Sequence, residues 1–276
     1  MIKQVTSKKN LNEAFARVYR NKGSAGVDKV HIKELKSILR IHGKQYVSHI
    51  ERKSYQVSPI LGVEIPKSNG KKRLLGIPTV VDRVFQQAIH QVLQPLFEPD
   101  FQKHSYGFRP QRNAHQATAQ SLLNINAGFQ HIVDIDLKSF FDEVSHCILL
   151  ELIYKKVKCK ATMRLLRSFL RAPILINGRL QKRRKGVPQG SPLSPLLSNI
   201  LLNELDKELE QRGHRYVRYA DDFSIYVKSN EAAKRVGNSI YKYLRDHLQL
   251  PINRVKSGVR RPLNFQVLGF GFVPTY

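Results

Sequence analysis

The sequence predicts a mixed α+β protein in which helices alternate with short strands joined by tight turns. Three observations lead to this fold class. Apolar residues recur at helical spacing in several segments, among them residues 10–20 and 231–249. Residues 132–137 alternate with the period of two that is typical of a strand. Residues 215–227 place two runs rich in Val, Ile, Tyr and Phe on either side of a short acidic turn, as in a β-hairpin.

The composition indicates a globular protein with a polyanionic partner. Its 276 residues are 41% hydrophobic, enough for one large domain or two closely joined ones. Lys and Arg number 47 against 21 Asp and Glu, which gives a net charge of +26 and favours nucleic acid as the partner. An anionic membrane is the rival, but the sequence has no basic amphipathic anchor and no long apolar span, so we expect no membrane association.

Cysteine usage and the N-terminus favour the cytoplasm. Cys147 and Cys159 are too few for a disulfide framework or a zinc site, which fits a reducing cytosol. The first ten residues lack the apolar core of a secretory signal. We therefore expect a cytoplasmic protein.

The N-terminal part is expected to be helical and then extended. A first helix over residues 10–20, with Asn10 as its N-cap, ends in a loop at 21–28, and a second helix follows around 31–52. Residues 54–65 are expected to be extended chain that leads into a basic turn.

That turn contains Asn69-Gly70, a strong hairpin signal, and it is ringed by cations. One interpretation is a solvated basic loop. The other is a flap in which Lys67 and Arg73 grip phosphate, the arginine through its bidentate fork. The motif alone leaves both interpretations open.

A helix and an aromatic loop follow. The helix opens at residues 78–83, ends near Gln94-Pro95, and carries on one side the apolar residues Val84, Phe85, Ala88, Ile89, Val92 and Leu93. The loop at 104–113 mixes aromatic residues, Gly and Arg. Such a mixture is typical of base stacking and backbone contacts on a template strand, and it is equally typical of a buried loop packed on the core.

Two carboxylates project from the strand at 132–137. Alternation places Asp134 and Asp136 on one face with Ile132, and the opposite face carries Val133, Ile135 and Leu137. Unpaired carboxylates are costly to bury in such a core-like strand, so a metal or basic groups must meet them. Residues 139–142 then begin a helix.

The segment from 174 to 213 joins a hairpin to a helix. The hairpin turns at Asn177-Gly178 and leads into the cationic run at 182–185. The rigid Pro188-Gln189-Gly190 turn comes next, and two Ser-Pro pairs, at 191 and 194, then offer an N-cap followed by proline at N1. The helix that they open stops before Gly213. Its N-terminal N–H groups and the positive end of its dipole face the Pro188-Gln189-Gly190 turn, so this turn is suited to bind a nucleotide.

The hairpin at 215–227 is predicted to turn at Asp221-Asp222. Two-residue hairpin turns normally use Asn-Gly or Asp-Gly, and adjacent carboxylates repel each other. Two adjacent aspartates at this turn are explained if a divalent cation neutralises both charges. The alternative is a plain turn whose aspartates are solvated. After the helix at 231–249, short strands are expected at 250–256 and 265–272.

Together these features equip a protein for two-metal nucleotidyl transfer. A strand-borne aspartate, a distant Asp-Asp hairpin and a helix-opening Pro-Gln-Gly turn occur in one electropositive chain. In that chemistry, cations about 3.5–4 Å apart activate a primer 3′-OH and stabilise the leaving pyrophosphate. Each motif is moderately specific, whereas their order and joint presence are highly specific.

The chain in this respect resembles a reverse transcriptase of the bacterial group II intron-encoded type, the intron maturases. The resemblance runs nearly end to end, with motifs at residues 21–28, 65–82, 105–110, 136–142, 188–199, 219–222 and 268–270. It implies a right-hand polymerase fold in which an antiparallel palm sheet is backed by helices. The N-terminal extension and fingers would occupy residues 1–130, with part of the palm near 75–110, and the palm would occupy residues 131–276.

The resemblance also implies the residues of the site and their partners. The catalytic carboxylates that bind two Mg²⁺ ions, for which Mn²⁺ can substitute, would be Asp136, Asp221 and Asp222, with Leu137 at the metal site; alternation alone leaves Asp134 open beside Asp136. The incoming nucleotide would contact Lys67, Arg73, Gln189, Lys256 and Phe141, the last as the aromatic gate that excludes ribonucleotides. Template and primer would contact Tyr106, Phe108, Arg109 and the primer grip Leu268-Gly269-Phe270. The implied partners are intron and template RNA, a DNA primer and dNTPs.

One departure from the family is that no helical thumb, maturase or endonuclease region follows the palm in this sequence. We expect poor processivity for that reason, and the bare palm or fingers faces would allow a homodimer. The main alternative function is an RNA-binding splicing cofactor with little polymerase activity, which the charge fits well but the intact aspartates argue against. A reverse transcriptase of a retron, a diversity-generating element or a defence system shares the chemistry, but the 105–110 motif favours the intron type.

Overall fold

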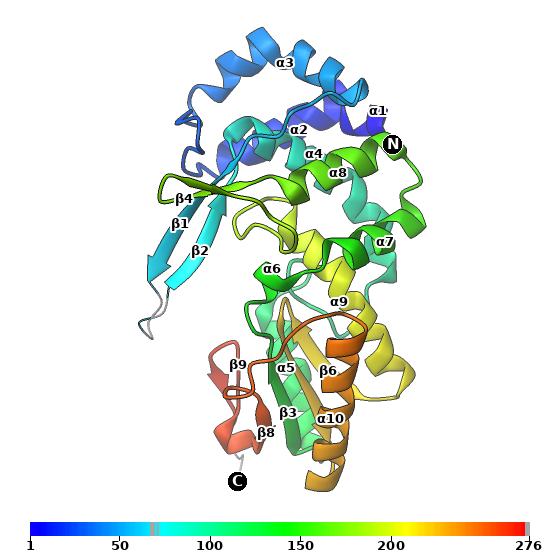
Figure 1. Cartoon of the computed structure of the whole chain (residues 1–276). Coiled ribbons are helices and arrows are strands. Elements are labelled where there is room, and N and C mark those ends of the chain that lie inside the picture. The colour runs from blue at the N-terminus through cyan, green and yellow to red at the C-terminus, as the bar shows by residue number, and fades with distance from the viewer. Residues whose placement is uncertain (67–69, 71, 274–276) are drawn as a thin grey trace. The chain divides into compact units, whose positions relative to one another are not determined.

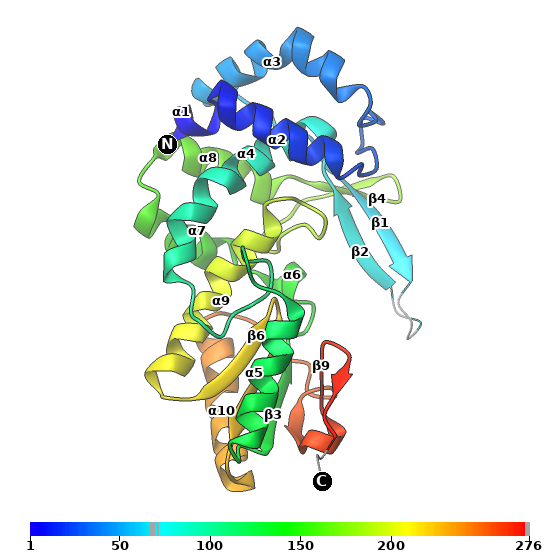
Figure 2. The same ribbon diagram turned by 180° about the vertical axis from the view of Figure 1, so that it is seen from behind.

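The computed structural model describes residues 1–66, 70 and 72–273, and the chain divides into two compact units (Figures 1 and 2). Unit 1 comprises Met1–Phe97 and Ser145–Leu197, and unit 2 comprises Glu98–Val144 and Ser198–Tyr276. Each unit combines helices with a four-stranded sheet, so the predicted mixed α+β class is confirmed. The boundary expected near residue 130 does not coincide with the limits of either unit, and the division into fingers and palm stays a prediction.

The helices of unit 1 are α1 (Ile2–Val5), α2 (Lys8–Arg20), α3 (Leu35–Glu51), α4 (Val80–Phe97), α7 (His146–Lys156), α8 (Lys160–Arg171) and the first residues of α9 (Ser194–Gln211). Of these, α2, α3, α4 and the start of α9 lie in predicted helical segments, whereas α1, α7 and α8 were not predicted. The N-cap predicted for the helix at 10–20 was wrong, because the side chain of Ser7 caps α2 by accepting a hydrogen bond from the backbone N–H of Asn10. The Asn10 side chain instead donates to the carbonyl oxygens of Val5 and Ala88.

The sheet of unit 1 contains both predicted Asn-Gly hairpins. Strand β1 (Ile60–Pro66) pairs antiparallel with β2 (Lys72–Ile77), which confirms the first hairpin, although Lys67 and Asn69 of its turn lie outside the described residues. Strand β4 (Ile174–Ile176) runs parallel to β1 and pairs antiparallel with β5 (Arg179–Gln181). Asn177 and Gly178 between them have φ values of 49° and 77°, the positive values that a type I′ turn requires.

Helix α4 is buried around most of its circumference rather than on one side. Its polar residues Asp82, Arg83 and Gln86 are each 7% exposed or less. Their hydrogen bonds explain how they are accommodated: the Asp82 carboxylate accepts from the Tyr55 hydroxyl at 2.8 Å and the Thr79 hydroxyl at 2.9 Å, for example. The helix also continues through Pro95 to Phe97 instead of ending near Gln94-Pro95. Proline has no backbone N–H and so removes one helical hydrogen bond, and at this position the loss affects only the last turn.

The sheet of unit 2 has the strand order β6-β7-β3-β8, and all its pairs are antiparallel. The strands are β3 (His131–Asp136), β6 (Arg215–Tyr219), β7 (Asp222–Val227) and β8 (Gly258–Arg260). Helix α10 (Asn230–Asp246) covers one face and α5 (Ala114–Asn126) covers part of the other (Figures 1 and 2). The short elements of unit 2 are η1 (Glu98–Asp100), α6 (Phe140–Glu143), η2 (Pro262–Asn264), β9 (Gln266–Val267) and β10 (Phe270–Gly271).

The C-terminal strands differ from the prediction. In the segment 250–256 only Ile252 forms a bridge, to Leu137, and the strand that completes the sheet lies a few residues later, in β8. The segment 265–272 is broken into β9 and β10 by Leu268 and Gly269, whose φ values of 52° and 86° turn the chain back on itself. Both errors arise because short apolar runs do not determine where a strand finds its partner.

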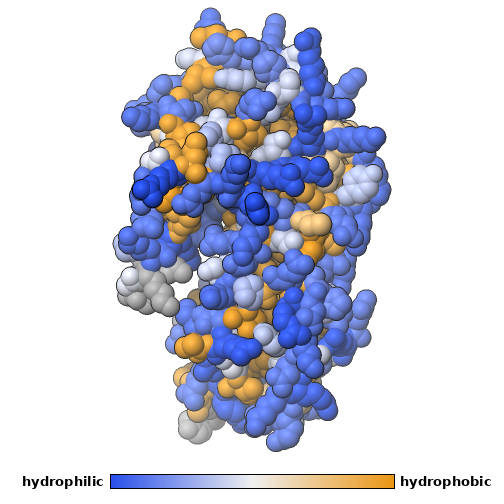
Figure 3. All heavy atoms as spheres, in the orientation of Figure 1, coloured by the Kyte–Doolittle hydropathy of each residue, from blue (hydrophilic) through white to orange (hydrophobic). Residues whose placement is uncertain are grey.

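Hydrophilic side chains cover most of the face shown in Figure 3, with smaller apolar areas between them. Among the residues that the structure describes, none of the helices is both long enough and apolar enough to cross a membrane.

Candidate active site

The carboxylates of unit 2 gather on one face of its sheet. Asp136, at the end of β3, lies opposite Asp222, at the start of β7, and Asp134 lies opposite Ser224. Side chains at directly opposite positions of an antiparallel pair project to the same face, with Cβ atoms about 4.5–5.5 Å apart. Asp134, Asp136 and Asp222 therefore share a face, as alternation predicted for the first two, and Asp221 precedes Asp222 in the turn.

The turn that carries these aspartates is shifted by one residue from the prediction. Tyr219 pairs with Asp222, so the two turn residues are Ala220 and Asp221, and Asp222 is the first residue of β7. Ala220 has φ of 58°, in the left-handed region that favours glycine, and it is only 7% exposed. A strained backbone of this kind persists only where the surroundings hold it in place.

Arg218 supplies that support from the opposite face of the sheet. Its guanidinium is fully buried and donates to both carboxylate oxygens of Asp206 on α9, with Nη2–Oδ2 at 2.5 Å and Nε–Oδ1 at 2.8 Å. It also donates to Asn199 Oδ1 at 2.9 Å, to Ser105 Oγ at 2.7 Å and to the carbonyl oxygen of Ala220 at 2.8 Å. One side chain thus connects helix α9, the loop at 104–113 and the turn.

The loop at 104–113 packs directly on that turn. The backbone N–H of Tyr106 donates to the carbonyl oxygen of Arg218 at 2.8 Å, and Asn199 donates to the carbonyl oxygen of Gly107 at 2.9 Å. A Cβ atom on Gly107 would lie 2.3 Å from the nitrogen of Ala220. Glycine at this position is therefore required by the close approach of two backbones.

The predicted template-contacting residues of this loop divide into buried and exposed ones. Tyr106 is 5% exposed and belongs to the core. The Arg109 side chain, also 5% exposed, forms an ion pair with Glu98 at 2.8 Å and donates to the carbonyl oxygens of Gln102 and Ser105. Phe108, by contrast, is 48% exposed. The interpretation as a buried loop therefore applies to Tyr106 and Arg109. The interpretation as a base-stacking loop stays open for Phe108, whose ring is exposed.

Basic groups meet the strand carboxylates, as the sequence required. Lys256 Nζ lies 3.4 Å from Asp136 Oδ2, and Arg260 Nε lies 3.6 Å from Asp134 Oδ2. Burial raises the pKa of Asp134, and the guanidinium of Arg260 opposes this shift. At Asp222, desolvation by the surrounding protein and repulsion from the other carboxylates raise the pKa to about 6, although part of the residue faces solvent.

This donor set fits a hard divalent cation in its chemistry. Carboxylate oxygens are the ligands that Mg²⁺ prefers. After burial, repulsion from the neighbouring carboxylates is the next cause that raises the pKa of Asp222, and a cation would offset that repulsion. Leu137, the residue after Asp136, is held by its bridge to Ile252 at the same end of β3. Within residues 1–66, 70 and 72–273, no three His, Cys, Asp or Glu side chains are already gathered as a ready-made metal site.

The other predicted residues lie in both units. Phe141, on α6 in unit 2, is half-buried with its ring 5.3 Å from that of Phe140. Arg73 is exposed on β2 in unit 1, and Lys67 lies outside the described residues. In the same unit the carbonyl oxygen of Gln189 accepts from the N–H of Gly76 at 2.8 Å, which places the Pro-Gln-Gly turn beside the end of β2. The predicted primer grip forms the β9–β10 turn, where Phe270 is 45% exposed.

Sequence reasoning missed the residues that hold the carboxylate turn in place. Arg218, Asp206 and Asn199 are each 1% exposed or less. A signal was present, because Arg218 interrupts an apolar strand and Asp206 lies among leucines on α9. Charged residues at such positions are almost always paired when buried, which would have linked the two.

Comparisons with known proteins point to one family. Residues 65–272 match the family described as "Reverse transcriptase (RNA-dependent DNA polymerase)". Protein YkfC of Escherichia coli (strain K12) is 31% identical over 94% of this chain and 78% of YkfC. Group II intron-encoded protein LtrA of Lactococcus lactis subsp. cremoris is 35% identical over 72% of this chain, but the chain spans only 34% of LtrA.

A solved structure shows the same fold at lower identity. The partial Cas6-RT-Cas1–Cas2 complex contains a chain that superposes with a TM-score of 0.54 and 23% identity, over 89% of this chain and 42% of that one. At this level of identity the likeness concerns the fold alone.

The close approach at Gly107 gives a first prediction. Gly107→Ala is expected to lower the free energy of unfolding by about 1–3 kcal/mol, the usual cost of overpacking, because its Cβ has no space. The matched control is Gly43→Ala in the interior of α3, where a Cβ meets nothing within 4 Å, and we expect it to stabilise by about 0.5–1 kcal/mol. Urea unfolding of both variants measures the difference, and equal effects would contradict the packing.

The carboxylate cluster gives a second prediction. The pKa of Asp222 is about 6 in the folded protein, above its ordinary value of 3.8. Between pH 3.8 and pH 6, Asp222 is therefore protonated in the folded state and ionised in the unfolded state. The contribution of Asp222 to stability therefore falls as pH rises from about 4 to about 6 and stays low above it. Without divalent cations, Asp222→Asn should raise the melting temperature by a few degrees at pH 7 and by much less at pH 4.5. A difference that is independent of pH would contradict the raised pKa.

Proposed function

The chain belongs to the reverse transcriptase family, and we propose that it is the RNA-directed DNA polymerase domain of a group II intron-encoded protein that also binds intron RNA to assist splicing and mobility. The match to the family covers residues 65–272. The similarity to LtrA, whose name describes it as group II intron-encoded, supports the intron type. The chain spans about a third of LtrA, so activities of the whole intron-encoded protein are part of the proposal.

A single observation carries the assignment of the site. The register of β3 and β7 places Asp136 beside Asp222, with Asp221 next to it in the turn. These three carboxylates are the residues that the family resemblance assigns to catalysis. The raised pKa of Asp222, caused first by burial and then by repulsion from neighbouring carboxylates, supports this role, because perturbed pKa values cluster at functional sites.

The proposed ligands of two Mg²⁺ ions, with Mn²⁺ as a substitute, are Asp136, Asp221 and Asp222, together with Leu137. When bound, such ions activate a primer 3′-OH and stabilise the leaving pyrophosphate. The protein itself contributes position: Arg218 fixes the turn, and Lys256 balances the charge of Asp136. Positioning and electrostatics of this kind are the main protein contributions to phosphoryl-transfer chemistry.

The remaining roles follow the resemblance and the exposure of each side chain. Arg73, Gln189 and Lys256 are proposed to contact the incoming nucleotide. Arg73 is exposed and able to bind phosphate through its fork, and Lys256 lies 3.4 Å from Asp136 Oδ2. Phe141 is proposed as the gate against the ribose 2′-hydroxyl. Phe108 and Phe270, each about half-exposed, are proposed to stack on template or primer bases.

A second candidate function rests on the net charge of +26. An RNA-binding splicing cofactor needs this charge but does not need the carboxylates. The two functions are separable by experiment, because phosphate contacts come from Lys and Arg, whereas nucleotide incorporation depends on the three aspartates.

The deciding experiment compares the wild-type chain with Asp221→Asn/Asp222→Asn. We expect the double variant to lose incorporation of dTTP on poly(rA)/oligo(dT) with Mg²⁺ by at least about a hundredfold while its RNA affinity in filter binding is unchanged. Glu231→Gln/Asp246→Asn, which removes the same charge from exposed sites on α10, is the matched control and should keep both activities. Incorporation by the double variant at the wild-type rate would refute the site, and RNA binding without incorporation by wild type would favour the splicing cofactor.

Phe141 gives a further prediction. Phe141→Val removes the ring proposed to crowd the sugar, so incorporation of ribonucleotides relative to deoxyribonucleotides should rise at least about tenfold, since loss of a steric contact of this size is worth about 1–3 kcal/mol. Single-nucleotide incorporation with rUTP and dTTP measures the ratio. Unchanged selectivity at an unchanged dTTP rate would exclude Phe141 as the gate.

A further inference from the structure

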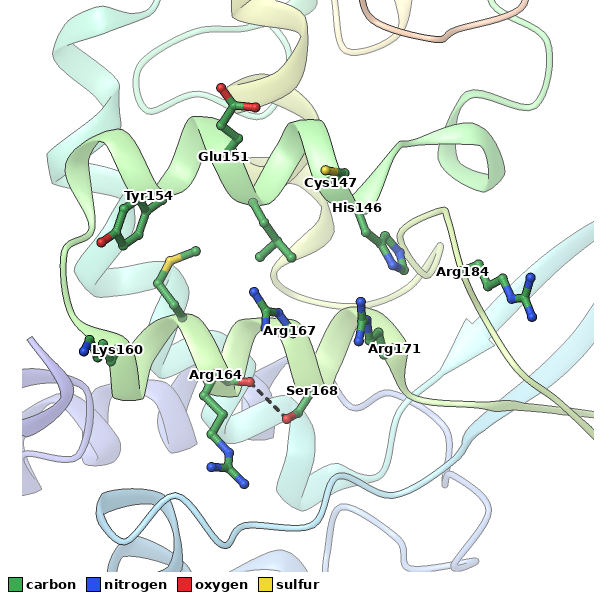
Figure 4. A pocket seen from close by; sticks show the side chains of 12 residues that line it. His146, Cys147, Glu151, Tyr154, Lys160, Arg164, Arg167, Ser168, Arg171 and Arg184 are labelled. Atoms are coloured by element: carbon green, nitrogen blue, oxygen red, sulfur yellow. Dashed lines mark hydrogen bonds between the residues drawn. The ribbon is translucent and has the colours of Figure 1, made fainter.

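A basic groove lies between helices α7 and α8 of unit 1, and none of its residues belongs to the carboxylate site of unit 2. It has a volume of about 1020 Å³. Five cations line it, with Glu151 as the single carboxylate among the lining residues; the cations are Lys160, Arg164, Arg167, Arg171 and Arg184. Figure 4 shows Arg164, Arg167 and Arg171 on α8, opposite α7, and Arg184 on the loop after β5.

The cations of α8 form one continuous stripe. Lys160, Arg164, Arg167 and Arg171 are spaced by four, three and four residues, so at 100° per residue they fall within about 60° around the helix axis. The stripe is about 16 Å long at a rise of 1.5 Å per residue. The opposite side of α8 is apolar and buried, with Leu166 fully inaccessible and Leu170 1% exposed. The stripe therefore faces outward because the helix is anchored by its other side.

Nothing in the described part of the chain neutralises this stripe. All four side chains are exposed, and none forms an ion pair with a described residue. Like charges at helical neighbour positions destabilise a helix by a few tenths of a kcal/mol per pair. Among the described residues this repulsive row therefore has no ion-pair partner, although Glu151 lines the same groove, and an anionic partner from outside would relieve the repulsion.

The far end of the groove is held in place. His146, at the start of α7 and 5% exposed, bonds through Nε2 to the carbonyl oxygen of Gly186 at 2.7 Å. Arg183 donates to the same oxygen at 2.7 Å, so the loop that carries Arg184 is tied to α7. Burial lowers the pKa of His146, and the nearby Arg183 and Arg171 add to this effect. Its other ring nitrogen, Nδ1, is buried without a hydrogen-bond partner.

We propose that this arginine groove, made of the α8 stripe and Arg184, is a docking surface for the phosphate backbone of a folded RNA. Four of its five cations are arginines, whose planar forks bind phosphate bidentately. The concave shape receives the convex ridge of an RNA backbone, whereas a flat bilayer surface does not reach a groove floor. The inference rests on the proposed function only in naming RNA as the polyanion.

The test uses the full chain and a labelled hairpin RNA with a base-paired stem. Arg164→Gln/Arg167→Gln/Arg171→Gln removes three cations from the stripe, and Lys234→Gln/Arg235→Gln/Lys242→Gln removes three exposed cations from α10 as the matched control. For the groove variant we expect the affinity at 100 mM salt to fall at least about tenfold and the slope of log K against log salt to become shallower by about 2–3. The control should change the slope by less than about one.

Two further measurements make the result decisive. Because the groove variant removes like-charge pairs, its melting temperature should be unchanged or slightly higher. If the groove variant instead unfolds, the variant with Lys at the same three positions replaces it. That Lys variant should keep the salt slope of the wild type but bind RNA more weakly, because it lacks the guanidinium forks. Equal losses in the groove variant and the control would overturn the proposal, because the affinity would then come from diffuse charge. The proposal would also be overturned if the groove variant lost binding to anionic phosphatidylserine vesicles while its RNA affinity stayed unchanged.

The same variants separate this inference from the polymerase assignment. On a short primer–template at saturating concentration, the groove variant should incorporate a single dNTP at the wild-type rate, because no groove residue is among those proposed for the carboxylate site. If wild type incorporates nothing while the groove variant loses RNA affinity, the groove stands and the polymerase assignment falls. If incorporation and RNA affinity fall in parallel in the groove variant, the groove is not a separate docking surface.

Discussion

The buried ion pair between Arg218 and Asp206 is the interaction on which the carboxylate site depends. Both side chains are fully inaccessible, and the guanidinium uses its remaining donors on Asn199, Ser105 and the carbonyl oxygen of Ala220. Breaking such a pair by removing one partner costs about 3–5 kcal/mol, because the other charge stays buried and uncompensated. Its main effect is geometric: it holds a strained alanine so that the next two residues, both aspartates, are presented at the end of the sheet.

The two faces of the sheet in unit 2 differ in their chemistry. The face that carries Val133 and Ile135 lies under α10 and supplies apolar burial. The face that carries Asp134 and Asp136 is apolar only where Ile132 joins the core with Tyr226, and it becomes acidic toward the turn. Burial and, after it, repulsion from the neighbouring carboxylates raise the pKa of Asp222, while Lys256 and Arg260 lie beside Asp136 and Asp134. A site of this kind is less stable alone than with a bound cation, which is common where function sets the charge.

The sequence predicted those parts of the molecule that local rules determine. Alternation in residues 132–137 placed Asp134 and Asp136 on one face correctly. The hairpin at Asn177-Gly178 was found because positive φ values at two successive residues have a clear sequence signature. The acidic turn was placed one residue late, because Ala220 adopts a glycine-like conformation that only Arg218 and the packing of Gly107 explain. The burial of Tyr106 and Arg109 depended on partners far away in the chain, and local rules give no such information.

The most direct test of the central claim is the response of stability to Mg²⁺. If Asp136, Asp221 and Asp222 are held together at a cost that a divalent cation relieves, Mg²⁺ should raise the melting temperature of the wild-type chain in a saturable way. The Asp222→Asn variant, in which that repulsion is already reduced, should respond little. Equal responses of the two proteins would show that the ion binds elsewhere, and the absence of any response in wild type would contradict the proposed metal site.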